Sequence, residues 1–293
     1  MPRAKTNNIE IEHETFGNAS DKPLLLVNGL GSQMINWDEE FIQLLVDRGF
    51  YVIRFDNRDV GLSTKCEEGG EPNLMQAVMA AQTGQPVESP YSLDDMADDA
   101  VGLLDALNIE KAHICGVSMG GMIVQTITIR HPSRVLSLTS IMSTTGNPDV
   151  PQGDPEVGQA LVTPVPKERD AVIENGVKMR RMIHGSGFPF DETKARELAG
   201  MNFDRCFYPS GFGRQLLAIM THGNRKPKLG SVKVPTLVIH GSDDPLVSVE
   251  GGKDTHDAIP GSELIIIEGM GHSLPPETWT QITDAIKANA AKA

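Results

Sequence analysis

The chain has 293 residues, of which 39% are hydrophobic and 22% charged, a composition typical of a folded globular protein. Its net charge of −13 opposes binding to phosphate backbones and to anionic lipid headgroups. We therefore expect neither a nucleic-acid-binding protein nor a membrane-surface protein. The short basic stretch at residues 225–228 is too small to change this expectation.

The N-terminal segment comes first along the chain. Residues 1–8 contain no apolar run of signal-peptide length, and no later segment reaches the roughly 20 apolar residues that cross a bilayer. These features predict a cytoplasmic protein. Residues 9–14 then alternate apolar and polar side chains, which favours an antiparallel strand with one exposed face.

Short apolar runs of strand length follow and alternate with helical patterns. Nearly continuous apolar strands are typical of a parallel sheet that helices cover on both faces. The predicted strands are 24–27, 51–55, 112–115, 135–142, 236–239 and 264–267, and the predicted helices are 92–107, 120–130, 248–258 and 277–290. Ser92 and Asp95 have the spacing of a capping pair at the start of one helix.

One region interrupts this alternation. Residues 147–230 contain no convincing strand, are punctuated by proline and glycine, and carry four methionines: Met179, Met182, Met201 and Met220. We interpret this segment as a mainly helical cap inserted between two core strands, over the ends of the sheet. The predicted core is therefore 1–146 together with 231–293, and the predicted cap is 147–230.

The strongest chemical motif is the run from Gly116 to Gly121, Gly-Val-Ser-Met-Gly-Gly, which fits G-x-S-x-G. In this pattern a sharp turn between a strand and a helix exposes the serine hydroxyl, and small neighbours let backbone segments approach closely. An apolar run precedes the motif and a helical pattern follows it, as the turn requires. We therefore predict that Ser118 is a nucleophile.

A serine needs a base, and the base needs an acid that orients it. In this type of fold the acid and then the histidine follow the serine along the chain. His272 comes directly after the last predicted strand and is the candidate base, whereas His240 fits a packed strand end. Asp243 and Asp244 follow the penultimate strand, and the chemistry alone leaves both open as the acid.

The first core strand ends in a glycine-rich loop, residues 27–31, which can offer a backbone N–H to an oxyanion. Met119, the residue after the nucleophile, offers a second N–H at the start of its helix. Two aimed donors stabilise a tetrahedral intermediate, and losing one costs about 3 kcal/mol of barrier.

The motifs at residues 24–64, 116–121, 234–245 and 269–275, including Asp-Asn-Arg-Asp-Val-Gly-Leu-Ser at 56–63, resemble bacterial α/β-hydrolases. Within that family the chain is similar to the aclacinomycin methylesterase-like group. The resemblance implies the α/β-hydrolase fold, selects Asp244 as the acid, and places the oxyanion donors at Leu30 and Met119. Most of the family has His-Gly where this chain has Asn28-Gly29, which alters the polarity beside the oxyanion site.

Together these features predict a serine esterase that cleaves a small-molecule carboxylic ester through an acyl-enzyme, with no metal or organic cofactor. The three cysteines, Cys66, Cys115 and Cys206, are too far apart for a metal site or a disulfide framework. The candidate pocket residues are Asn28, Trp37, Met179 and Met182, although packing of the cap onto the core explains any single one of them slightly better.

Two alternatives stay open. Lactones and thioesters are cleaved by the same triad, and a ligand receptor can retain the whole fold without turnover. Dehalogenases and epoxide hydrolases need a carboxylate nucleophile, which Ser118 does not provide. The sequence leaves the oligomeric state open.

Overall fold

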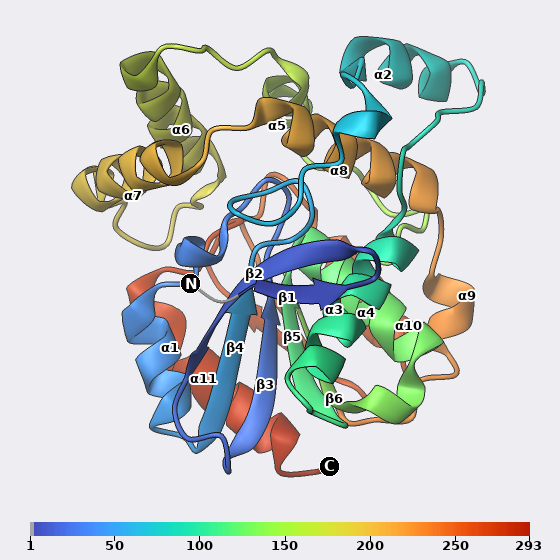
Figure 1. The fold of residues 1–293 in the computed structure, drawn as a ribbon, viewed down its shortest axis with the longest axis vertical. Coiled ribbons are helices and arrows are strands. Elements are labelled where there is room, and N and C mark those ends of the chain that lie inside the picture. The colour runs from blue at the N-terminus through green and yellow to red at the C-terminus, as the bar shows by residue number, and fades with distance from the viewer. Residues whose placement is uncertain (1–2) are drawn as a thin grey trace.

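The computed structural model describes residues 3–293, so the first two residues of the predicted core segment lie outside it. Its centre is an eight-stranded sheet in the order β1-β2-β4-β3-β5-β6-β7-β8, seen in Figure 1. β1 and β2 are antiparallel to their neighbours, and the other pairs are parallel. The strands are β1 (Arg3–Thr6), β2 (Ile9–Phe16), β3 (Lys22–Val27), β4 (Phe50–Phe55), β5 (Ala112–Val117), β6 (Val135–Ile141), β7 (Thr236–Gly241) and β8 (Glu263–Ile267).

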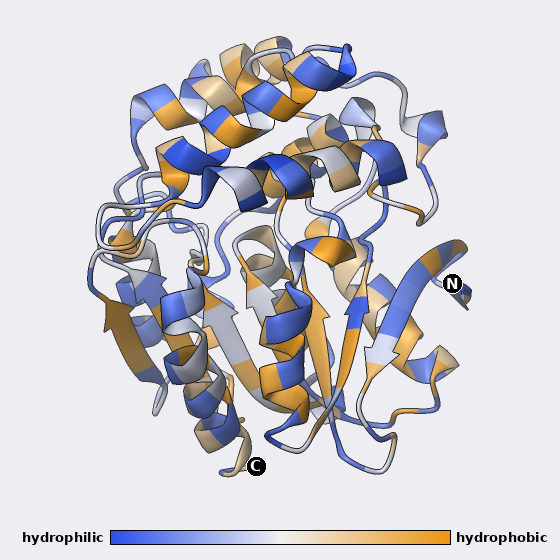
Figure 2. Ribbon diagram, turned by 90° about the vertical axis from the view of Figure 1, so that its left-hand side faces the viewer, coloured by the Kyte–Doolittle hydropathy of each residue, from blue (hydrophilic) through white to orange (hydrophobic). Residues whose placement is uncertain are grey.

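Helices cover both faces of this sheet, as the apolar strands predicted. α1 (Glu39–Val46) and α11 (Trp279–Ala290) lie on one face, and α3 (Leu93–Ala106), α4 (Met119–Arg130) and α10 (Val249–Ala258) lie on the other (Figure 1). Each face has its own apolar cluster of strand and helix side chains. Figure 2 shows the apolar strands between these two helical layers.

Every predicted strand and core helix is confirmed, with ends that shift by a few residues. The capping pair is also present: the Asp95 N–H donates to Ser92 Oγ at 3.2 Å, and the Ser92 N–H donates to Asp95 Oδ2 at 2.8 Å.

Among the strands and α-helices described outside residues 147–230, β1, α1 and α2 (Leu74–Gln82) were not predicted. β1 is a four-residue edge strand with mostly polar side chains, so its sequence has no apolar run to reveal it. α1 did leave a signal, since Asp38 caps its start and Phe41, Ile42 and Leu45 fall at helical spacing.

The inserted segment 147–230 is helical and holds no strand, as predicted. Its first four helices lie over the carboxyl ends of the parallel strands (Figures 1 and 2) and are called the cap below: α5 (Pro155–Val162), α6 (Arg169–Ile183), α7 (Glu192–Arg205) and α8 (Pro209–His222). The fifth, α9 (Lys226–Leu229), packs against α4 and α10 of the core instead. None of the helices between residues 3 and 293 has the length and apolar character to cross a membrane.

Candidate active site

Ser118 occupies the turn between β5 and α4, with φ 56° and ψ −121°. A positive φ is strained for a residue with a side chain, and such strain is typical of functional sites. Two contacts from the neighbouring strand hold the turn: the Ser118 N–H donates to Ile141 O at 2.9 Å, and Ser143 Oγ donates to Ser118 O at 2.8 Å. The predicted strand–turn–helix setting of Ser118 is therefore present.

The glycines of the motif are needed because backbone segments meet behind this turn. A Cβ on Gly116 would lie 2.1 Å from the carbonyl oxygen of Gly120, and a Cβ on Gly120 would lie 2.1 Å from that of Val27. Gly29 of the loop after β3 lies against the serine itself, since a Cβ there would be 3.2 Å from Ser118 Cβ. The glycine-rich loop is thus directly beside the serine.

His272 lies on the loop after β8, and Asp244 lies on the loop after β7. His272 Nδ1 is 2.7 Å from Asp244 Oδ2, and Asp244 Oδ1 accepts hydrogen bonds of 2.9 Å from the N–H groups of both Leu246 and Val247. Burial acts to raise the pKa of Asp244, but the adjacent His272 and a hydrogen bond from His240 outweigh it and hold the pKa well below its usual value. Asp244 is therefore an ionised partner for the histidine.

Of the two aspartates that the sequence left open, Asp244 is the one that contacts His272. The neighbouring Asp243 accepts a hydrogen bond from Ser242 Oγ at 2.9 Å and another from Ser186 Oγ in the cap. Asp243 thus links the core to the cap and does not face the histidine.

His240, at the end of β7, is fully buried, as the packed strand end required. The sequence did not reveal that it also approaches the acid. Its Nε2 donates to Val247 O at 2.9 Å and lies 3.4 Å from Asp244 Oδ2. A second imidazole therefore fixes the loop that carries Asp244.

Ser118 and His272 line the same cavity, but the structure records no hydrogen bond between the serine hydroxyl and the imidazole. Such gaps are common in substrate-free sites and close in the complex with substrate. The hydrogen bond between Asp244 and His272 is thus formed, and Ser118 lines the same cavity as His272.

The two predicted oxyanion donors are free. Within residues 3–293, neither the N–H of Leu30 nor that of Met119 donates to another residue. The loop that carries Leu30 is fixed from both sides. Asn28 Nδ2 donates to Gln33 O at 3.1 Å, and the Gly31 N–H donates to Gln215 Oε1 at 2.8 Å. Both N–H groups are therefore available to donate hydrogen bonds to a developing negative charge.

A cavity of about 990 Å³ lies between the core and the cap and contains this site. Asn28, Trp37 and Met179 line it, as predicted. Met182 does not, which corrects the prediction: the lining residues of α6 share one helix face, and Met182 lies on the flank of that face. Much of the apolar wall of the cavity was not identified as such from the sequence. It includes Leu198, Phe212, Leu216, Ile219 and Met220.

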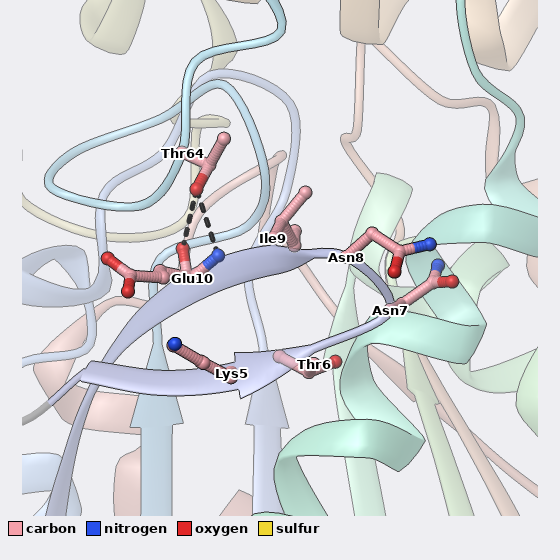
Figure 3. Close-up of a pocket in the computed structure, with 7 residues that line it drawn as sticks. All are labelled: Lys5, Thr6, Asn7, Asn8, Ile9, Glu10 and Thr64. Atoms are coloured by element: carbon pink, nitrogen blue, oxygen red, sulfur yellow. Dashed lines mark hydrogen bonds between the residues drawn. The ribbon is translucent and has the colours of Figure 1, made fainter.

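A second hollow, of about 550 Å³, lies at the hairpin of β1 and β2 and is drawn in Figure 3. Its lining contains no histidine, cysteine or serine, and Thr64 Oγ1 is hydrogen-bonded to the backbone of Glu10 there (Figure 3). This hollow therefore lacks the serine and the histidine that the predicted hydrolysis needs.

Cysteines and metal ligands do not form a rival site. Burial raises the pKa of the Cys66 thiol to about 11 and that of Cys115 to about 12, so both stay protonated near neutral pH. Within the described part of the chain, no three side chains of His, Cys, Asp or Glu gather as a metal site.

The cap contacts the histidine loop through backbone groups. The N–H of His272 donates to Ile183 O at 2.6 Å, that of Gly271 to His184 O at 3.0 Å, and that of Gly187 to Gly269 O at 2.9 Å. The approach leaves no room for side chains, because a Cβ on Gly187 would lie 2.6 Å from Gly269 Cα. We call this the glycine contact.

The cap also contacts the other half of the site, through α8. Arg214 makes two hydrogen bonds, of 2.8 and 2.9 Å, to the Asp59 carboxylate, and Gln215 Nε2 donates to Arg58 O at 2.8 Å. Asp59 and Arg58 belong to the 56–63 motif, whose role here is to anchor the cap. Arg214 and Gln215 gave no sequence signal, because their partners are more than 150 residues away along the chain.

The chain is similar to known hydrolases in sequence and in fold. The chain is 28% identical to the rhodomycin D methylesterase DnrP of Streptomyces peucetius, over 100% of this chain and 99% of that protein. It is 24% identical to 3-oxoadipate enol-lactonase 2 of Acinetobacter baylyi, over 95% and 93% of the two chains. The meta-cleavage product hydrolase CumD of Pseudomonas fluorescens IP01 superposes with a TM-score of 0.76 at 21% identity, over 100% and 98%. The profile of the alpha/beta hydrolase fold matches residues 22–277, and the chain belongs to that family.

Proposed function

We propose that this protein is a serine-dependent carboxylic ester hydrolase that acts through an acyl-enzyme on Ser118. The 2.7 Å contact between His272 and the buried Asp244, in the same cavity as the strained Ser118, carries the proposal. Family membership and the methylesterase relative support ester hydrolysis in general. The triad and the covalent intermediate are our inference from the geometry.

In the first half-reaction, Ser118 Oγ attacks the ester carbonyl while His272 Nε2 accepts the hydroxyl proton. Asp244 holds His272 Nδ1 as the N–H tautomer and stabilises the imidazolium that forms. The carbonyl oxygen becomes an oxyanion and takes hydrogen bonds from the free N–H groups of Leu30 and Met119. His272 then protonates the departing alcohol, which leaves an acyl group on Ser118.

In the second half-reaction, a water molecule takes the place of the alcohol. His272 accepts a proton from the water, the hydroxide attacks the acyl carbonyl, and the same two N–H groups stabilise the new oxyanion. Collapse returns the proton from His272 to Ser118 and releases the carboxylic acid. Of the residues in this proposed cycle, Ser118, His272 and Leu30 line the cavity.

The size of the cavity favours a medium-sized, mainly apolar substrate. A volume of about 990 Å³ is at the upper end of the usual range for small-molecule sites, which is about 300–1,000 Å³. A methyl ester of a larger acid fits both this volume and the methylesterase relative. A lactone, which is a cyclic ester, is the second candidate, in view of the enol-lactonase relative.

The test is hydrolysis of p-nitrophenyl esters from acetate to decanoate by wild type, Ser118→Ala and Ser231→Ala. Ser231 is an exposed serine far along the chain, and it serves as the matched control. We expect turnover by wild type and Ser231→Ala, with a loss of about 10³-fold or more in Ser118→Ala. Equal turnover by Ser118→Ala, or no turnover of any ester or lactone by wild type, would refute the proposal.

A further inference from the structure

The charged side chains that line the cavity are not all neutralised. Lys194 Nζ lies 2.7 Å from Asp38 Oδ2, and the Asp191 carboxylate accepts the N–H of Lys194 at the start of α7. Among the described residues, Arg180 and Arg225 line the cavity without an ion pair to any carboxylate. Both cationic groups lie in a protein whose net charge is −13.

Arg225 is held by neutral oxygens of the core. Its Nε donates to Gln125 Oε1 at 3.1 Å, and its Nη2 donates to Thr144 O at 2.7 Å. Only 4% of the residue is exposed, so its guanidinium is fixed within the wall. These contacts give Arg225 a structural role at this side of the cavity.

Arg180, on α6 of the cap, has no comparable support. Its one recorded hydrogen bond is a long one, from Nη2 to Asn36 Oδ1 at 3.4 Å, and that oxygen already accepts from Asn202 Nδ2 at 2.9 Å. Burial lowers the pKa of Arg180 from its ordinary value. A guanidinium still stays protonated near neutral pH, so the cavity holds a charge that lacks a counterion.

The adjacent Arg181, on the same helix, lies in a different environment. Arg181 is on the outer face, pairs with Glu192, and has 55% of its side chain exposed. An outward arginine is solvated and costs little, whereas an unpaired charge in a mainly apolar cavity is costly unless an anion joins it. The fork of N–H donors on a guanidinium matches a carboxylate in two parallel hydrogen bonds.

From this arrangement we propose that Arg180 binds a carboxylate of the substrate, so that the preferred esters carry a second, free carboxylate group. This inference rests on the proposed function and narrows its substrate class. The overall charge of −13 repels such a substrate at a distance, but screening by salt weakens this repulsion beyond about 8 Å.

The first experiment compares substrates that differ only in this charge. p-Nitrophenyl half-esters of glutaric, adipic and suberic acids are compared with p-nitrophenyl pentanoate, hexanoate and octanoate. A second pair, 4-carboxyphenyl and phenyl hexanoate, places the carboxylate on the alcohol side. We expect wild type to favour at least one carboxylated ester by about 10-fold or more in kcat/KM, as a charge-assisted hydrogen bond provides.

Arg180→Met should remove that preference, by about 10- to 100-fold on the carboxylated ester, and leave the neutral ester within about 3-fold. Arg180→Lys should keep part of it, because lysine supplies the charge without the fork. Arg181→Met is the matched control, since it removes the same charge one residue away on the outer face. Its selectivity should equal that of wild type.

A binding measurement separates this inference from the proposed function. Calorimetric titration of Ser118→Ala with adipate and suberate, against hexanoate and octanoate, does not depend on turnover. We expect the dicarboxylates to bind about 10-fold more tightly, and Arg180→Met in the same background to abolish the difference. No preference for carboxylated ligands in either experiment, or equal losses in Arg180→Met and Arg181→Met, would overturn the inference even if neutral esters are hydrolysed.

Discussion

The two sides of the cap are attached to the molecule in different ways. On the α8 side, Arg214 and Asp59 form an ion pair whose side chains are 1% and 0% exposed. The pairs Arg169–Asp204 and Arg196–Glu174 join α6 to α7 within the cap and are between 41% and 64% exposed. At the end of α7, Arg205 pairs with the buried Asp56 of the core at 2.8 Å. Breaking a buried pair typically costs several kcal/mol, whereas exposed pairs contribute little. α8 is thus the fixed wall of the cavity, and α6, whose ion pairs are exposed and lead to α7, is the more easily displaced helix.

This difference matters because each side supports a different half of the candidate site. α8 holds the oxyanion loop, through Gln215 and Gly31, whereas the segment after α6 contacts the His272 loop through the glycine contact. Displacement of α6 would therefore disturb the base before it disturbed the oxyanion donors. It would also move Arg180, which α6 carries.

The largest expected effect is on stability. Arg214→Met leaves Asp59 buried without its partner, so we expect the free energy of unfolding to fall by about 3–5 kcal/mol. Urea denaturation followed by circular dichroism measures it. A loss below about 1 kcal/mol would remove the distinction between the two sides.

The second prediction concerns the glycine contact. Gly187→Ala places a Cβ 2.6 Å from Gly269 Cα, so the loop that carries His272 must shift. We expect kcat for a p-nitrophenyl ester to fall by about 10- to 100-fold, because a displacement near 1 Å has that effect on catalytic geometry. Gly158→Ala on α5 is the control, since a Cβ there meets nothing within 4 Å. Equal kcat values in the two variants would show that the contact does not position the base.

The third prediction uses pH to loosen the α8 side. His222 ends α8, and burial, with help from the nearby Arg225, lowers its pKa from 6.5 to about 4. Between these pH values the unfolded chain binds a proton at His222 that the folded protein does not, so stability falls as the pH drops from about 6.5 to about 4.

The contribution of His222 is on the order of 2 kcal/mol, and His222→Gln should reduce the loss by that amount. Urea midpoints at pH 7 and pH 4.5 measure the difference between wild type and variant. Identical pH dependence in both proteins would mean that His222 titrates normally.

The smallest effect is expected on the α6–α7 side. Arg196→Met removes an exposed pair, so the urea midpoint should change little, and 1 M salt should abolish the change. Parallel urea titrations at low and high salt measure this. A loss comparable to that of Arg214→Met would mean that the exposed pairs of α6 stabilise the protein as much as the buried pair of α8.

Much of the fold was predictable because it depends on local patterns. The apolar runs located six strands, an alternating pattern located β2, and Gly116, Ser118 and Gly120 located the sharp turn. Such signals are short-range, since they follow from the period of a strand or from crowding at a turn. β1 was not predicted because an edge strand of mostly polar residues has neither an apolar run nor a sharp turn.

The rest depended on contacts between distant residues. Asp243 and Asp244 are adjacent residues of the same type, so the chemistry alone could not distinguish them. The family resemblance selected Asp244, and the structure shows that Asp244 contacts His272. The pairing of Asp59 with Arg214 spans 155 residues, and no spacing rule connects them. Met182 does not line the cavity, because the packing of the whole cap decides which face of α6 turns toward it. Met179, three residues earlier on α6, does line the cavity.

The central claim, that Ser118 is a nucleophile activated by His272, is tested most directly by covalent labelling. Wild type, Ser118→Ala and His272→Gln are incubated with a fluorophosphonate, and intact-protein mass spectrometry follows the adduct. We predict one adduct per wild-type chain, on the peptide that contains Ser118, no adduct in Ser118→Ala, and labelling slowed by about 10²-fold or more in His272→Gln. An adduct that persists in Ser118→Ala, or a wild-type protein that stays unlabelled, would contradict the account.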